Sequence, residues 1–201
     1  MPDVTDDPAQ LHPDTLITDF DTFENHGHLD DNQEAVDMIY GFADKGFLHR
    51  CKTLDECISY LGGQQPVLSK FACLSKTKFD ANSGKMRHKL KVIMDSKRSG
   101  VKAASARKFK AVLPRITDAI HAALDLLDSR ESGELLEFLV VDAEDAFWQL
   151  PLRVSERRFF VGKVRNEYFI YTRTAQGSRG APVSWAALFG LSTRCIQGLY
   201  R

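Results

Sequence analysis

The spacing of apolar residues changes repeatedly along the chain, and this constrains the fold more than any other feature of the sequence. Segments with the 3.6-residue period of a helix are 32–46, 53–61, 115–129 and 183–199. Strand-like runs are 66–76, 88–97, 136–141, 157–164 and 168–172. The resulting order is helix, helix, hairpin, helix, strand, hairpin, helix. This order predicts an α+β fold with mostly antiparallel strands, and it lacks the regular alternation of a doubly wound fold.

The two longest strand-like runs predict a β-hairpin. Residues 66–76 and 88–97 flank a polar stretch, DANSGK, that suits a turn. In the returning strand Leu90, Val92 and Met94 alternate with other residues, two of which are Lys89 and Lys91. The run 136–141 has no such alternation, and its composition predicts a buried strand.

Charge is strongly segregated along the sequence. Residues 1–44 contain 12 acidic residues and no Lys or Arg, whereas residues 70–115 contain 14 basic residues opposed only by Asp80 and Asp95. We expect a disordered or loosely docked acidic arm over 1–32, a helical segment over 33–63 and a larger domain over 64–201. The basic segment favours a polyanion, most commonly nucleic acid. The alternative is a solvated basic face that the acidic arm neutralises.

Several protein classes are excluded by composition. No run approaches the roughly 18–20 apolar residues that a membrane span needs. The acidic N-terminus fits neither a secretory signal nor a transit peptide. The four cysteines form no C-x-x-C pair and are too scattered for a disulfide framework. We therefore expect an intracellular protein, cytoplasmic or nuclear, with no membrane partner.

The stretch LVVDAEDAFWQLPL, residues 139–152, leads an apolar run to two carboxylates, Asp142 and Asp145. A carboxylate at the end of a buried strand can bind a hard divalent cation such as Mg²⁺. Two metals at such a place would stabilise the attacking and leaving oxygens of phosphoryl transfer. The alternative is that both aspartates simply cap the next turn or helix.

A second motif, TAQGSRGAPVS, precedes the last helix. Gly177 and Gly180 would let the backbone approach a ligand closely, and Pro182 suits the first turn of a helix. On its own this motif is equally consistent with an ordinary glycine-rich helix entry.

Taken in order, D-x-x-D-A-F-W-Q-L-P-L and Q-G-x-x-G-A-P resemble the polymerase domain of reverse transcriptases, especially those of retrotransposon and retroviral Pol polyproteins. The resemblance covers about residues 64–201. Upstream it is looser, where KLKVIMDSK is similar to a basic fingers hairpin that ends in Asp95 and Lys97. It implies a partial fingers and palm fold and RNA-directed DNA polymerase chemistry.

The resemblance implies roles for the first motif. Asp142 would be a catalytic, metal-binding carboxylate, with the Ala143 carbonyl in the metal shell. Asp145 and Ala146 would face the incoming triphosphate. Phe147 would exclude a 2′-hydroxyl, so that deoxynucleotides are preferred. The implied cofactors are two Mg²⁺ or Mn²⁺ ions, and the implied partners are an RNA or DNA template–primer and a dNTP.

The remaining roles follow from the same resemblance. Gln176 and Gly177 would contact the nucleotide or the template strand. Lys91 would neutralise triphosphate charge, with Lys89 as the alternative, although both could equally be solvated strand residues. Trp148 is expected to pack beneath the site.

The chain departs from the family at its third motif. No Asp or Glu follows Pro182, so the aromatic-x-Asp-Asp turn is missing from these 201 residues. We therefore expect the 201-residue product to lack polymerase activity unless further polyprotein segments complete the palm. Two other functions stay open: a non-catalytic nucleic-acid-binding remnant that uses residues 70–115, and a structural domain whose acidic arm covers its own basic face.

Overall fold

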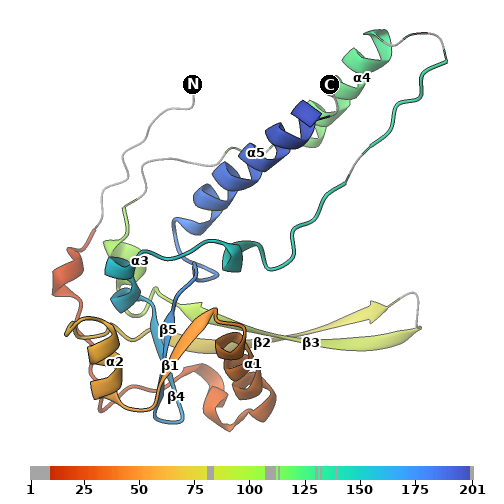
Figure 1. The fold of residues 1–201 in the computed structure, drawn as a ribbon. Coiled ribbons are helices and arrows are strands. Elements are labelled where there is room, and N and C mark those ends of the chain that lie inside the picture. Colours follow the sequence, from red (N-terminus) through yellow and green to blue (C-terminus); the bar gives the residue numbers. More distant parts are fainter. Residues whose placement is uncertain are drawn as a thin grey trace.

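The computed structural model describes residues 10–80, 84–106, 112, 114–129, 131, 133–138 and 140–199. Its body is a three-stranded antiparallel sheet with the strand order β1-β5-β4, from which a separate two-stranded hairpin and two helices project (Figure 1). The sheet strands are β1 (Leu48–Cys51), β4 (Val161–Val164) and β5 (Glu167–Tyr171). Mixed helices and antiparallel strands confirm the α+β class.

Apolar side chains cover both faces of the central strand β5. Phe169 and Tyr171 face a cluster with α1 (Gln33–Asp44), while Tyr168 and Ile170 face a smaller cluster with α2 (Leu54–Tyr60). This alternation explains why β5 is almost entirely apolar. Because β1 pairs with β5, residues 33–63 share a sheet and a core with the later part of the chain.

The expected hairpin is confirmed. Strands β2 (Lys70–Asp80) and β3 (Lys85–Asp95) pair antiparallel over eleven residues each. The base of the hairpin is anchored where Phe71 packs against the sheet, directly over Gly162. The outer half projects away from the body (Figure 1).

The predicted helices are also present. They begin and end close to the expected residues: α1, α2, α4 (Ile116–Ser129) and α5 (Ala181–Leu199). The Thr53 hydroxyl accepts a hydrogen bond from the Glu56 N–H, which caps α2. Short elements that periodicity did not reveal are β1, α3 (Val101–Ala104), η1 (Pro13–Thr15), η2 (His26–Asp31), η3 (Ala146–Gln149) and η4 (Val154–Phe159).

The expectation of a disordered arm is wrong for residues 10–32; residues 1–9 lie outside the described part of the chain. Leu29 is buried in the main core. The Asn25 side chain accepts a bond from the Phe71 N–H and donates to the Lys163 carbonyl, each at 2.8 Å. The sparse apolar and amide side chains of this segment therefore fasten it to the base of β2 and to β4.

The expectation of a buried strand at 136–141 is wrong for the residues described there; Leu139 lies outside them. Residues 133–138 and 140–143 have no regular structure, and Phe138 and Val140 are largely exposed. A strand needs a neighbour to satisfy its backbone groups, and the described chain places none beside this segment.

Candidate nucleotide site and basic face

The two sequence motifs lie side by side. The Leu152 N–H donates to the Thr172 carbonyl at 2.9 Å, and the Thr174 N–H donates to the Leu150 carbonyl at 2.8 Å. These bonds join the end of the first motif to the chain that leads into the second. The fold thus brings together segments that are more than twenty residues apart in sequence.

Trp148 is the anchor of the first motif. It is buried, and its ring stacks on Phe47 at a centroid distance of 5.0 Å and on Tyr171 at 5.5 Å. The expectation that Trp148 packs in the core is confirmed. Phe147, its neighbour in η3, is only half-buried and so has a face open to solvent.

Asp145 begins η3 with a left-handed backbone, φ 53°, which Asp tolerates better than most residues. It stands at the N-cap position, but its carboxylate makes no capping bond. That carboxylate instead lies 3.8 Å from the Lys45 ammonium. Lys45 directly follows α1. The spacing of apolar residues gave no sign that this cation would lie near the first motif.

Asp142 and Ala143 lie in the irregular segment before η3, and Asp142 is exposed. Within the described part of the chain, no three His, Cys, Asp or Glu side chains gather into a group that could hold a metal ion. Asp142 alone offers one carboxylate, which is too few donors for a two-metal site. The donor set does not fit the implied ions, and we assign no metal-dependent step to this chain by itself.

The second motif approaches the hairpin. Gly177 has φ 95°, which favours glycine, and a Cβ built there would be 3.6 Å from the Met94 carbonyl oxygen. Gln176, beside it, is half-buried. Lys91 lies three residues before Met94 in β3, or roughly 10 Å along a strand. Asp95 bonds to His26 at 2.9 Å and to the Lys97 N–H, so its role is structural.

The register of the hairpin places every Lys and Arg of both strands on one face. Side chains alternate along a strand, and directly paired residues share a face. The pairs Lys76–Lys89, Lys78–Arg87 and Leu74–Lys91 therefore point the same way. The lysine face, as we call it, consists of Lys70, Lys76, Lys78, Lys85, Arg87, Lys89 and Lys91.

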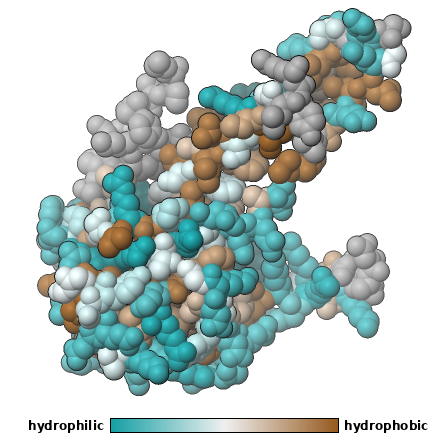
Figure 2. Space-filling model, viewed as in Figure 1, coloured by the Kyte–Doolittle hydropathy of each residue, from teal (hydrophilic) through white to brown (hydrophobic). Residues whose placement is uncertain are grey.

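The opposite face of the hairpin carries no Lys or Arg. Phe71 pairs with Met94 and Cys73 with Val92, and these side chains turn toward the core. Near the tip, Phe79 pairs with Met86, and both are exposed. Lys76, Lys78, Lys85, Lys89 and Lys91 are exposed, and the part of the hairpin visible in Figure 2 is mostly hydrophilic.

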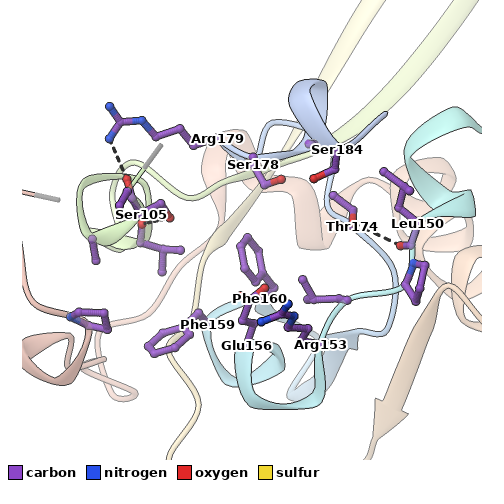
Figure 3. Close-up of a pocket in the computed structure, with 18 of the residues that line it drawn as sticks. Ser105, Leu150, Arg153, Glu156, Phe159, Phe160, Thr174, Ser178, Arg179 and Ser184 are labelled. Atoms are coloured by element: carbon purple, nitrogen blue, oxygen red, sulfur yellow. Dashed lines mark hydrogen bonds between the residues drawn. The ribbon is translucent and has the colours of Figure 1, made fainter. Parts of the chain in front are cut away.

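A pocket of about 520 Å³ is lined in part by the ends of both motifs, Leu150–Leu152 and Gly180, but not by Asp142, Phe147 or Gln176. It is bounded by α3, η4 and the start of α5 (Figure 3). Arg179 donates to the Ser105 carbonyl at 2.8 Å, and the Thr174 hydroxyl donates to the Leu150 carbonyl at 3.2 Å. Two of the four segments that form this pocket belong to the motifs, but nothing in the sequence indicated that residues 13–16 and 101–106 would join them.

No family model, no curated protein and no solved structure matches the chain. No described helix is long and apolar enough to cross a membrane.

Proposed function

We propose that the protein binds nucleic acid through the lysine face of the β2–β3 hairpin, in the role of the fingers of a reverse-transcriptase-like polymerase. The observation that carries the proposal is the register, which gathers seven basic side chains on one face. Like charges directly opposite each other in a ladder cost stability. A polyanion bound to this face would offset the repulsion of such a pair, Lys76–Lys89.

The spacing of these cations suits a phosphodiester backbone. Successive side chains on one face of a strand are roughly 6.6–6.8 Å apart. Contacts of this kind are independent of sequence and release counterions, so affinity falls steeply with salt. The lysine face therefore predicts binding that is strong at low salt and tolerant of base sequence.

The test is fluorescence anisotropy of a labelled RNA–DNA template–primer and of the matching single strand. We expect log affinity to fall linearly with log salt, with a slope of about −4 to −6 if most of the lysine face contacts phosphates. The double variant Lys76→Gln/Lys89→Gln should weaken binding and reduce the slope by about 1.4–1.8.

The control variant removes two charges elsewhere. Lys52 follows β1 and Arg194 lies on α5, and both are exposed. Lys52→Gln/Arg194→Gln should leave the slope unchanged. The proposal would be overturned if the two double variants lost the same amount of affinity for nucleic acid, or if the unmodified protein did not bind at low salt.

A specific observation also favours the polymerase assignment. The backbone bonds between Leu150–Leu152 and Thr172–Thr174 bring the two motifs together, as a shared nucleotide pocket requires. In that assignment Phe147 excludes a 2′-hydroxyl, Ala146 and Gln176 line the pocket, and Lys91 neutralises phosphate. The metal-binding carboxylates beyond Asp142 would come from outside the described residues.

Equilibrium binding of dNTP and rNTP to the protein–template–primer complex tests this assignment without catalysis. We expect tighter binding of the dNTP, a smaller difference in Phe147→Ala, and weaker binding of both in Gln176→Ala. Equal affinity of the unmodified protein for the two nucleotides would contradict it. Primer extension with Mg²⁺ or Mn²⁺ should give no incorporation by this chain alone; incorporation that Asp142→Ala abolishes would show otherwise.

A further inference from the structure

Residues 115–145, which we call the α4 segment, expose most of the large apolar side chains that the structure describes there, from Ile116 to Val141. Helix α4 has an apolar stripe at helical spacing, yet no described residue of it is buried. Beyond the helix Leu135 is 85% exposed and Phe138 74% exposed. Hydrophobic surface covers much of the projecting part of the molecule (Figure 2). Contiguous apolar surface of this kind marks an interaction site.

The second half of the α4 segment has no regular secondary structure over its described residues before η3. Residues 135–138 and 140–143 belong to no helix or strand. A segment outside regular secondary structure that carries apolar side chains can add as a strand to the open edge of a sheet. The surface therefore fits a partner that presents strand edges.

The charge of the α4 segment identifies the partner. It contains nine acidic and two basic residues, a net charge of −7, whereas residues 70–91 contain seven basic and one acidic residue, a net charge of +6. The outer half of the β2–β3 hairpin has open edges, exposed cations and an exposed apolar pair, Phe79 and Met86. Backbone, charge and apolar surface are thus complementary between two parts of the same sequence.

We propose that the α4 segment of one protomer binds the β2–β3 hairpin of a second copy of this chain. Within one protomer the hairpin and α4 project from the body in different directions (Figure 1). The contact is therefore intermolecular. It joins two different surfaces, and a pair of protomers that exchange both contacts forms a closed dimer.

The proposal has a consequence for nucleic-acid binding. The lysine face would be used both by the second copy and by nucleic acid. Self-association and nucleic-acid binding should then compete, and each should weaken as salt rises. Nucleic acid added to the associated protein is expected to release protomers.

The experiment is size-exclusion chromatography with light scattering, over a range of protein concentrations at about 0.1 M and about 1 M salt. The unmodified protein should associate at the lower salt and dissociate at the higher. Two charge-reversal variants should each remain monomeric: Lys76→Glu/Lys89→Glu in the hairpin, and Asp128→Lys/Glu137→Lys in the α4 segment. Circular dichroism confirms that each variant is folded.

Mixing the two variants gives the decisive result. The acidic hairpin of the first matches the basic α4 segment of the second, so an equimolar mixture should form a heterodimer. A mixture that stays monomeric while the unmodified protein associates would overturn the proposal. So would a monomeric unmodified protein, or association that neither salt nor charge reversal affects. In those cases the binding partner of the α4 segment would be another protein.

Discussion

Lys76 and Lys89 lie directly opposite each other in the β2–β3 ladder, on the same exposed face. Two like charges directly opposite each other repel, which destabilises the ladder. The hairpin therefore carries a charge arrangement that lowers its own stability.

This relationship predicts opposite effects of one substitution on stability and on binding. Lys89→Glu should raise the free energy of unfolding by about 0.2–1 kcal/mol, because it converts a repulsive pair into an attractive one. The same variant should bind nucleic acid more weakly. Urea denaturation followed by tryptophan fluorescence measures the first effect, and anisotropy the second. If stability and affinity fell together, the variant would simply be misfolded and the assignment of Lys89 to a binding face would lose its support.

Trp148 and Phe147 are adjacent in sequence but should differ sharply in their contribution to stability. Trp148→Ala removes a buried ring from the stack with Phe47 and Tyr171, so it should cost about 3–5 kcal/mol. Phe147→Ala removes a half-buried ring and should cost clearly less. The free energy of unfolding from urea titration, followed by far-ultraviolet circular dichroism, compares the two. If both variants lost the same free energy of unfolding, the assignment of Trp148 to core packing and of Phe147 to the site would be contradicted.

Gly162 in β4 should not tolerate a methyl group. A Cβ at this position would overlap the ring of Phe71, which is itself buried. Gly162→Ala should therefore lower the thermal midpoint, and the smaller side chain in Gly162→Ala/Phe71→Leu should recover part of the loss.

The control for this prediction is Gly190→Ala on helix α5, where no atom lies within 4 Å of the added methyl. In a helix interior alanine is favoured over glycine by about 0.5–1 kcal/mol. Gly190→Ala should thus be neutral or stabilising. A Gly162→Ala protein as stable as the unmodified one would mean that Phe71 does not pack over β4 as described.

Glu167 joins two strands and a helix. Its carboxylate accepts hydrogen bonds from Arg50 at 2.7 and 2.8 Å and from the Tyr40 hydroxyl at 2.6 Å. The hydrogen bonds from Arg50 are the main reason that the pKa of Glu167 is lower than its usual value. At neutral pH, Glu167→Gln should lower stability by about 1.5–3 kcal/mol, the range for hydrogen bonds to a charged group.

The pH dependence follows from the same shift. Because the pKa of Glu167 is lower in the folded state, its stabilising effect is complete above the unfolded value, about 4.5. The effect is lost as pH falls through the folded value. Urea midpoints between about pH 6 and pH 3 should therefore converge for the unmodified protein and Glu167→Gln. Glu24→Gln, an exposed carboxylate near η2, is the control and should follow the unmodified curve.

Local patterns were enough to predict much of the secondary structure. Helical spacing identified α1, α2, α4 and α5, and alternation with a polar turn identified the β2–β3 hairpin. The strand-like runs at 157–164 and 168–172 predicted the second hairpin, whose turn residues Arg165 and Asn166 have positive φ angles. These features depend on interactions between near neighbours in sequence, which explains why periodicity finds them.

The incorrect secondary-structure predictions concern segments whose structure depends on contacts with residues far away in the sequence. Strand β1 is only four residues long, and its pairing with β5, more than a hundred residues later, makes it a strand. Residues 10–32 read as disordered because they have few apolar residues, but Leu29 and Asn25 find partners on β2 and β4. The apolar run at 136–141 lacks the neighbour that a strand requires.

The same division applies to the candidate site. The motif residues Asp142, Asp145, Phe147 and Gln176 could be named from the sequence, since residue type and spacing are local. Only the tertiary structure showed that the two motifs are hydrogen bonded to each other, that Asp145 faces Lys45, and that Asp142 has no companion ligands in the described chain. The sequence by itself determined the number of cations in the hairpin strands. Their collection on a single face was decided by the pairing register, because that register sets which side chains of two strands share a face.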